Sequence, residues 1–204
     1  MPLAAYTAWL DYAGVAGFAV GSAIVPRRRQ FDFTATLLIA CAAALGGGTL
    51  RDLLIQQPVF WVVDPGYVVV CLIAAACVWF AGVGSITVGI VTMVESVGIG
   101  CFAVVGAAKA LNAGTSPIVS VIMGALTATF GGIVSETLAG RNTVLTRREI
   151  YVTAALASAT IYYLLLSVGV VRWVAASLSA TTGMVLRLAT LFFGWRMPVP
   201  RSRR

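Results

Sequence analysis

The sequence predicts an all-α integral membrane protein with seven transmembrane helices, arranged as two inverted three-helix repeats followed by a seventh helix. Three observations predict this class. Hydrophobic residues make up 60% of the 204 residues and charged residues only 10%, the apolar residues fall in seven long runs, and the two halves of the chain align with each other. A soluble domain uses about 25% charged residues to face water. This chain has too few for that, so we expect its surroundings to be a lipid bilayer.

Seven apolar runs have the length that a membrane requires. A bilayer core about 30 Å thick is crossed by roughly 20 residues of helix. The runs lie at about 6–25, 34–55, 67–84, 89–109, 116–138, 150–170 and 173–193. Their connections are short, so we expect residues 1–204 to form a single transmembrane domain. Repeat 1 covers about 6–84, repeat 2 about 89–170 and helix 7 about 173–193, and a basic tail follows at 194–204.

The basic residues predict the orientation. The formal net charge is +7, and the excess is clustered between apolar runs rather than spread over a surface. We therefore do not expect nucleic-acid binding. Basic loops stay on the cytoplasmic side of a membrane. This rule predicts an outer N-terminus and a cytoplasmic C-terminus, because one set of alternate loops and the C-terminal tail carry Arg27, Arg28, Arg29, Arg141, Arg147, Arg148, Arg196, Arg201, Arg203 and Arg204.

An internal duplication is visible at a gapless offset of 84 residues, which aligns Asp11 with Glu95. The same offset places Gly47-Gly48 on Gly131-Gly132 and Asp52 on Glu136. Each unit holds three spans, and an odd number turns the second unit upside down relative to the first. Inverted repeats of this kind often place a binding or permeation site at their interface.

Glycine-rich stretches in spans 2 and 5 are the main candidates for function. A glycine in a helix interior costs roughly 1 kcal/mol relative to alanine. Close packing of helices is one reason to keep it. The other is a bend that frees backbone carbonyls, which is tolerated inside a membrane when it lines a water-filled cavity. We predict bent helices that form a gated constriction, with the candidate residues Gly46, Gly47, Gly48, Thr49, Arg51, Asp52, Lys109, Thr129, Gly131, Gly132, Ser135 and Glu136.

Ionisable residues inside the spans are candidates for function by default. Arg51 and Asp52 either take part in permeation or form a charge network that fixes the bend. Lys109 either lines the pathway or extends to the membrane surface. Asp11 and Glu95, about one turn inside their spans, are expected to favour the helix N-termini.

No pattern in the sequence indicates an enzyme. The chain has no histidine, and its four cysteines form no CxxC pair. We find no metal-ligand cluster, no nucleophile with a base and no phosphate-binding loop. We expect no cofactor and no metal site, and the expected ligands are permeant K⁺ or Na⁺ and bound lipid.

Three stretches carry a resemblance to a known family. GGGTLRDLLIQQPVFWV (46–62), FAVVGAAKAL (102–111) and SPIVSVIMGALTATFGGIVSETLAG (116–140) resemble the prokaryotic members of the trimeric intracellular cation (TRIC) channel family. The resemblance implies a homotrimer in a prokaryotic plasma membrane, with a pore in each protomer. It also implies conduction of monovalent cations, chiefly potassium, through the bent second and fifth helices. The residue matching Lys109 is implied to contribute to voltage dependence.

One position departs from the family pattern. Family members often repeat an Arg-Asp pair after the second glycine motif, where this chain has Ser135 and Glu136. The leading hypothesis is a potassium-permeable cation channel. The alternative is a secondary transporter of small ions or solutes, which also uses inverted repeats. A non-conducting scaffold is the third reading, and it leaves the charged groups in the spans without a role.

Overall fold

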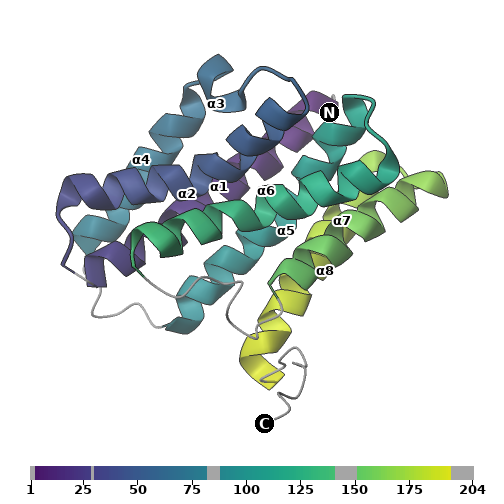
Figure 1. The fold of residues 1–204 in the computed structure, drawn as a ribbon. Coiled ribbons are helices and arrows are strands. Elements are labelled where there is room, and N and C mark those ends of the chain that lie inside the picture. Colours follow the sequence, from purple (N-terminus) through teal and green to yellow (C-terminus); the bar gives the residue numbers. More distant parts are fainter. Residues whose placement is uncertain (1–2, 29, 82–87, 141–150, 194–204) are drawn as a thin grey trace, which may run out of the picture.

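The computed structural model describes residues 3–28, 30–81, 88–140 and 151–193. Within these residues the structure is all-α, without a strand (Figure 1). The predicted basic tail 194–204 and the arginines at 29, 141, 147 and 148 lie outside the described residues. The helices are α1 (Leu3–Arg28), α2 (Phe33–Leu54), α3 (Phe60–Val63), α4 (Gly66–Ala81), α5 (Val88–Asn112), α6 (Pro117–Leu138), α7 (Val152–Ser167) and α8 (Arg172–Phe193).

The seven long helices match the seven predicted spans, with ends that differ by a few residues. The single-turn helix α3 was not predicted. By length and composition, Phe33–Leu54, Met93–Asn112 and Pro117–Leu138 are able to cross a membrane, and three further apolar helices are shorter. Among the described residues α8 is in neither group, and it contains the buried Arg187.

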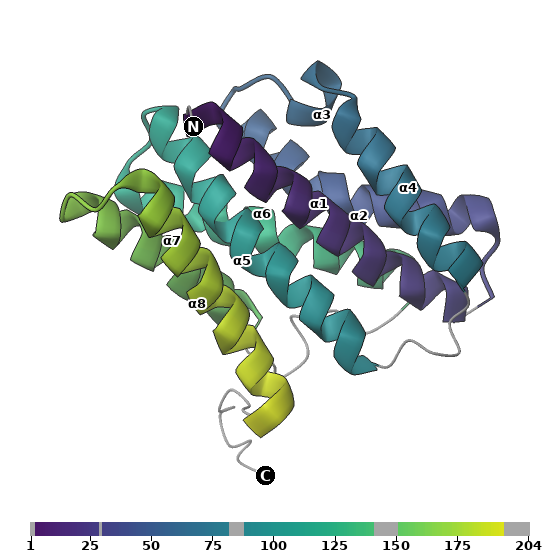
Figure 2. The same ribbon diagram turned by 180° about the vertical axis from the view of Figure 1, so that it is seen from behind.

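Two three-helix units pack in the same way. In the first unit α1 packs against α2 and α4, and α2 against α4; in the second, α5 packs against α6 and α7, and α6 against α7. The units meet through α1 with α5 and α2 with α6, and α8 covers α5 and α7. Figures 1 and 2 show α1 and α5 running in opposite directions. The structure therefore confirms inverted repeats plus an additional helix.

Helix caps and ring contacts follow the same offset of 84 residues. Asp32 caps α2, and its counterpart Ser116 caps α6. The rings of Phe18 and Phe102, which are also counterparts, stack with centroids 5.2 Å apart and planes inclined by 13°. A residue that contacts its own counterpart lies at the axis relating the two units. The pseudo-two-fold axis therefore passes between these two rings.

The prediction that α2 and α6 are broken at their glycines is wrong. Both helices are α-helical throughout, from Phe33 to Leu54 and from Pro117 to Leu138. The glycines instead allow the two backbones to touch. A Cβ atom at Gly47 would overlap the carbonyl oxygen of Thr127, and one at Gly131 would overlap the carbonyl oxygen of Ala43.

These two contacts are reciprocal, because 47 and 131 are counterparts and so are 43 and 127. Small residues at a helix–helix interface give close backbone approach and dispersion contact where lipid supplies little hydrophobic drive. Close packing, the alternative reading of the glycine stretches, is therefore what the structure supports.

We expect Gly47→Ala and Gly131→Ala to destabilise the protein, because each added methyl group would meet backbone that cannot move aside. Overpacking of this kind costs about 1–3 kcal/mol. Gly46→Ala is the matched control, since no atom lies within 4 Å of a Cβ built there. Thermal unfolding of the detergent-solubilised protein measures the difference, and equal melting temperatures for Gly46→Ala and Gly47→Ala would contradict the packing.

Candidate functional site

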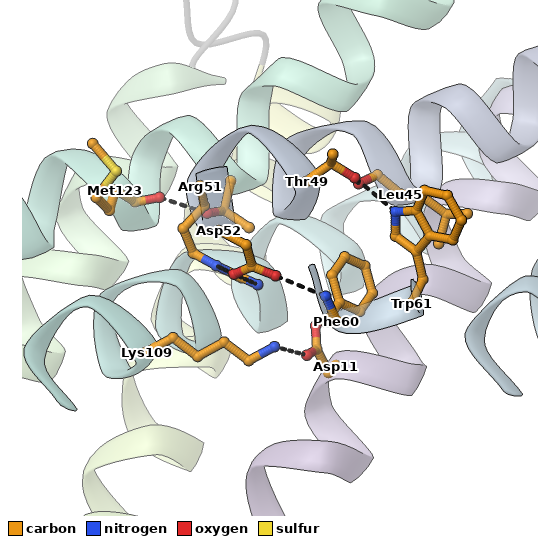
Figure 3. Close-up of polar contacts among 10 residues, drawn as sticks. Asp11, Leu45, Thr49, Arg51, Asp52, Phe60, Trp61, Lys109 and Met123 are labelled. Carbon is orange, nitrogen blue, oxygen red and sulfur yellow. Dashed lines mark hydrogen bonds and ion pairs between the residues drawn. The ribbon is translucent and has the colours of Figure 1, made fainter. Parts of the chain in front are cut away.

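Five residues from four helices meet at the end of the bundle that holds α3 and the start of α1. They are Asp11 of α1, Arg51 and Asp52 of α2, Phe60 of α3 and Lys109 of α5 (Figure 3). We call them the Phe60 cluster. Four of the five residues carry formal charge, and the fifth, Phe60, is the first residue of α3.

Arg51 and Asp52 form a fully buried ion pair. Arg51 Nε donates a hydrogen bond to Asp52 Oδ1 over 2.8 Å, and Arg51 Nη2 lies 2.7 Å from the same oxygen. The Arg51 side chain has 0% of its surface exposed. Nη2 is close enough for attraction but is not oriented for a second hydrogen bond, and Nη1 has no hydrogen-bond partner among the described residues. Such an orphaned charged donor is rare in native interiors.

Asp52 also organises the turn after α2. Its Oδ2 accepts a hydrogen bond from the backbone N–H of Phe60 over 3.0 Å, and its backbone carbonyl accepts one from Gln57 over 2.8 Å. The indole Nε1 of Trp61 donates to Thr49 Oγ1 over 2.8 Å. Residues 56–63 are thereby folded back over the end of α2, which places the Phe60 ring against the charges.

Lys109 pairs with Asp11 across the two repeats. Lys109 Nζ lies 2.7 Å from Asp11 Oδ2, and the side chains are 32% and 2% exposed. Lys109 therefore has an acidic partner on the other repeat, and Asp11 is engaged by this pair and not by its helix terminus alone. Both cations lie over the Phe60 ring, with Arg51 Cζ 5.8 Å and Lys109 Nζ 5.0 Å from its centroid. Cation–π attraction acts within about 6 Å of a ring centroid.

A hydrogen-bonded corner fixes α3 and α4 beside the cluster. The Tyr12 hydroxyl donates to Asp64 Oδ2 over 2.7 Å, and the Gly66 N–H donates to Asp64 Oδ1 over 2.9 Å. These donors hold the pKa of the Asp64 carboxyl below its usual value, the Tyr12 hydroxyl contributing most. Tyr12 also stacks on Tyr67, with ring centroids 4.1 Å apart. The corner ties α1 to the start of α4.

A cavity of about 310 Å³ opens beside the Phe60 cluster. Its lining combines an acid, a base, two amides and apolar groups: Asp52, Ile55, Gln57, Pro58, Phe60, Lys109, Asn112 and Ala113. The four charged residues of the cluster sum to zero. The cavity therefore offers both signs of charge and neutral hydrogen-bonding groups to a small solute.

The predicted site residues do not form one site. Arg51, Asp52 and Lys109 lie together in the Phe60 cluster. Gly46 and Thr49 line an apolar groove of about 610 Å³ on the outer side of α2, and Gly48 packs against Phe60.

The candidate residues of the second repeat lie elsewhere. Ser135 and Glu136 are buried near the other end of the bundle, as inversion requires. Thr129 Oγ1 donates to the Ala125 carbonyl over 2.8 Å, and Gly132 packs against Tyr151.

The sequence reasoning missed two members of the cluster. Phe60 lies in the stretch 46–62 that resembles the TRIC family, but nothing in the sequence indicates that its ring contacts the two cations. For Asp11 the sequence predicts only an interaction with its helix terminus. The presence of acids and bases together inside the spans, Asp11, Asp52, Arg51 and Lys109 among them, was a signal that could have suggested ion pairs.

The fold and the cluster define a helical membrane protein with paired charges inside its bundle. The family whose sequence model matches the chain is described as glycine transporter, and the model matches twice, at residues 8–82 and 84–167. The chain belongs to this family, and the two matches confirm the duplication. It is a family of membrane channels and transporters and not of enzymes.

Individual proteins similar to this chain narrow the family assignment. The UPF0126 inner membrane protein YadS of Escherichia coli K12 is 31% identical over 199 residues, which cover 94% of each chain. The TRIC trimeric intracellular cation channel orthologue from Rhodobacter sphaeroides is 38% identical, with a TM-score of 0.87 over 93% of this chain and 98% of that one. A further TRIC cation channel structure has 25% identity and the same TM-score over the full length of both chains. The resemblance to the TRIC family is confirmed.

We expect Asp52→Asn to destabilise the fold, because the buried guanidinium of Arg51 would lose its negative partner. Removing one member of a buried ion pair costs about 3–5 kcal/mol. Asp32→Asn is the matched control, since Asp32 is an exposed N-cap and asparagine caps helices equally well. The measurement is thermal unfolding in detergent. Equal melting temperatures for the two variants would show that the pair does not hold the cluster.

Proposed function

We propose that this protein is a potassium-permeable channel for monovalent cations, with a pore in each protomer of a homotrimer. The observation that carries the proposal is a cluster of paired charges beside a cavity, inside the helical bundle of a chain 38% identical to a TRIC channel orthologue. Charged side chains inside a membrane protein are retained mainly along pathways for ions or substrates.

In this proposal the pathway leads from the cavity along the interface of α2 and α6. The reciprocal backbone contacts at Gly47 and Gly131 close it, so opening requires the two helices to separate there. The gate lies near the glycine stretches, as the sequence suggested, but it works by contact between two intact helices. Because the Phe60 cluster has no net charge, we expect it to add little to the preference for cations over anions. Weak discrimination between potassium and sodium is proposed from the likeness to TRIC cation channels alone.

Lys109 is the proposed voltage-responsive group. Its side chain is the more exposed member of its ion pair, and a charge that moves across a membrane potential changes energy by about 2.3 kcal/mol per 100 mV when it crosses fully. The proposal includes an outer N-terminus and a cytoplasmic C-terminus in a prokaryotic plasma membrane. Bound lipid is expected in the apolar groove on α2.

We expect Lys109→Gln to weaken voltage dependence and to raise the permeability ratio of cations over anions. Loss of one positive charge leaves the Phe60 cluster with a net charge of −1, which attracts cations. Recordings of purified protein in planar bilayers, with KCl gradients for reversal potentials, measure both quantities. Asp32→Asn is the control, because Asp32 is an exposed charge at the start of α2, outside the cluster and the cavity lining.

If Lys109→Gln leaves both quantities at their wild-type values, Lys109 is not in the pathway. Absence of unitary potassium currents from wild-type protein at every voltage would remove the channel proposal itself.

Glycine transport is a second candidate, favoured by the description of the matching family and by the cavity lining. A glycine zwitterion carries an ammonium and a carboxylate. The cavity places the carboxylate of Asp52 and the ammonium of Lys109 on its wall, with the amides of Gln57 and Asn112 beside them. In this second candidate function, the α2–α6 contact keeps the cavity from being open to both sides of the membrane at the same time.

Uptake of radiolabelled glycine into proteoliposomes separates the two functions. For a transporter we expect saturable uptake that unlabelled glycine competes away, and Lys109→Gln should raise the half-saturating concentration by removing the partner of the glycine carboxylate. The control solute is labelled glycolate, which lacks the ammonium group. Uptake that is linear in glycine concentration and accompanied by potassium currents would favour the channel.

A further inference from the structure

Asp11 is a buried carboxylate whose charge is balanced by a side chain that lines the cavity. Its side chain is 2% exposed, and Lys109 Nζ lies 2.7 Å from its Oδ2. Lys109 is 32% exposed and lines the cavity of about 310 Å³, whereas Asp11 is absent from the described lining. The ammonium of Lys109 therefore separates a buried negative charge from a space of solute size.

The face of Phe60 completes the surroundings of this ammonium. Lys109 Nζ lies 5.0 Å from the centroid of the Phe60 ring, and Figure 3 shows it pointing toward Asp11 beside that ring. A carboxylate attracts a cation by its charge, and an aromatic face attracts it by the negative potential over the ring. The two groups suit any small monovalent cation, and not only a lysine.

The position of the ring does not depend on the lysine. The N–H of Phe60 donates to Asp52 Oδ2 over 3.0 Å, and the Phe60 ring meets the ring of Tyr67 at 76° with centroids 4.8 Å apart. Tyr67 in turn stacks on Tyr12, the residue after Asp11 on α1. The carboxylate and the ring are held by other contacts, so the site keeps its shape when the ammonium leaves.

The ammonium is able to leave because its stem is flexible and the cavity wall offers other acceptors. Lysine carries a compact charge on a four-carbon stem with rotatable donors. Asp52, Gln57 and Asn112 line the same cavity and present a carboxylate and two amides. Departure of the ammonium leaves Asp11 as an uncompensated buried charge, which is strongly unfavourable. A second cation that enters from the cavity removes that penalty.

We propose that Asp11 and the face of Phe60 form a binding site for a small monovalent cation, and that Lys109 occupies this site as a tethered competitor. The ligand is an alkali ion or the primary ammonium group of a solute, because both combine a single positive charge with a small radius. The inference deepens the proposed function, since it names a cation site on the proposed pathway, but binding at this site is measurable without flux.

The decisive variant is Lys109→Ala, which vacates the site. Its thermal unfolding in detergent is compared in potassium, methylammonium and tetraethylammonium chlorides of equal concentration, the last cation being too bulky for the site. We expect potassium or methylammonium to raise the melting temperature by about 3 °C or more relative to tetraethylammonium, once its concentration is about ten times the dissociation constant. The rise should grow with the logarithm of the concentration.

Two controls isolate the site. Lys109 holds it in the wild type, and the carboxylate is gone in the Asp11→Asn, Lys109→Ala double variant, so neither protein should show this rise. A rise limited to potassium assigns the site to an alkali ion, and one limited to methylammonium assigns it to a solute ammonium. Equal melting temperatures for Lys109→Ala in all three salts, or the same rise in the double variant, would overturn the proposal.

The ring is tested by adding Phe60→Leu to Lys109→Ala. Loss of the cation–π attraction should raise the cation concentration needed for a given rise by roughly twofold to thirtyfold. An unchanged concentration dependence would remove the ring from the site and overturn the proposal in that part.

A second variant applies if Lys109→Ala does not fold. Lys109→Gln keeps the length of the side chain without its charge, and we expect the same order of salts with a smaller rise, because the amide competes for the site. The same rise in Asp11→Asn, Lys109→Gln, or none in either, would overturn the proposal. A wild type that carries neither potassium nor glycine would contradict the proposed function, while the melting temperatures would still decide whether this site binds a cation.

Discussion

The backbone contact between α2 and α6 is the constraint on which the rest of this structure depends. In lipid there is little hydrophobic driving force for helices to associate, so van der Waals contact between closely packed atoms holds them together. Gly47 and Gly131 permit that approach at two symmetric points. The contact fixes the position and rotation of α2 and α6 relative to each other. It therefore determines where the side chains of Arg51, Asp52 and Glu136 lie.

Charge balance is the second constraint, and it acts between elements that are distant in the sequence. Lys109 and Asp11 join the two repeats, whereas Arg51 and Asp52 are neighbours on one helix. The Phe60 ring accepts both cations on its faces. A single-turn helix, α3, therefore unites an ion pair within one repeat and an ion pair between repeats, because a backbone hydrogen bond to Asp52 sets its starting point.

Most of the fold was predictable, because it follows from helix length and hydrophobicity. The spans and the inverted repeat were read from apolar runs and from the alignment of Asp52 with Glu136. The sequence did not predict whether α2 and α6 are broken or intact at their glycines. A glycine lowers the cost of bending a helix and also the cost of bringing two helices close together, and the neighbouring backbone determines which of the two occurs. Partners such as Asp11 for Lys109 depend on which helices meet, which the order of residues does not specify. The turn of α3 is too short for a periodic pattern.

The two stacked phenylalanines at the pseudo-two-fold axis have a consequence for how such a chain diverges after gene duplication. Phe18 and Phe102 face each other, so a change of volume in one must be absorbed by its own copy, and the two positions are tied together. Residues away from the axis do not contact their own counterparts, so a change of volume at one of them does not constrain the other. Position 51 holds an arginine and its counterpart 135 a serine, and a difference between the two repeats is accommodated most easily at such positions, which do not contact their own counterparts.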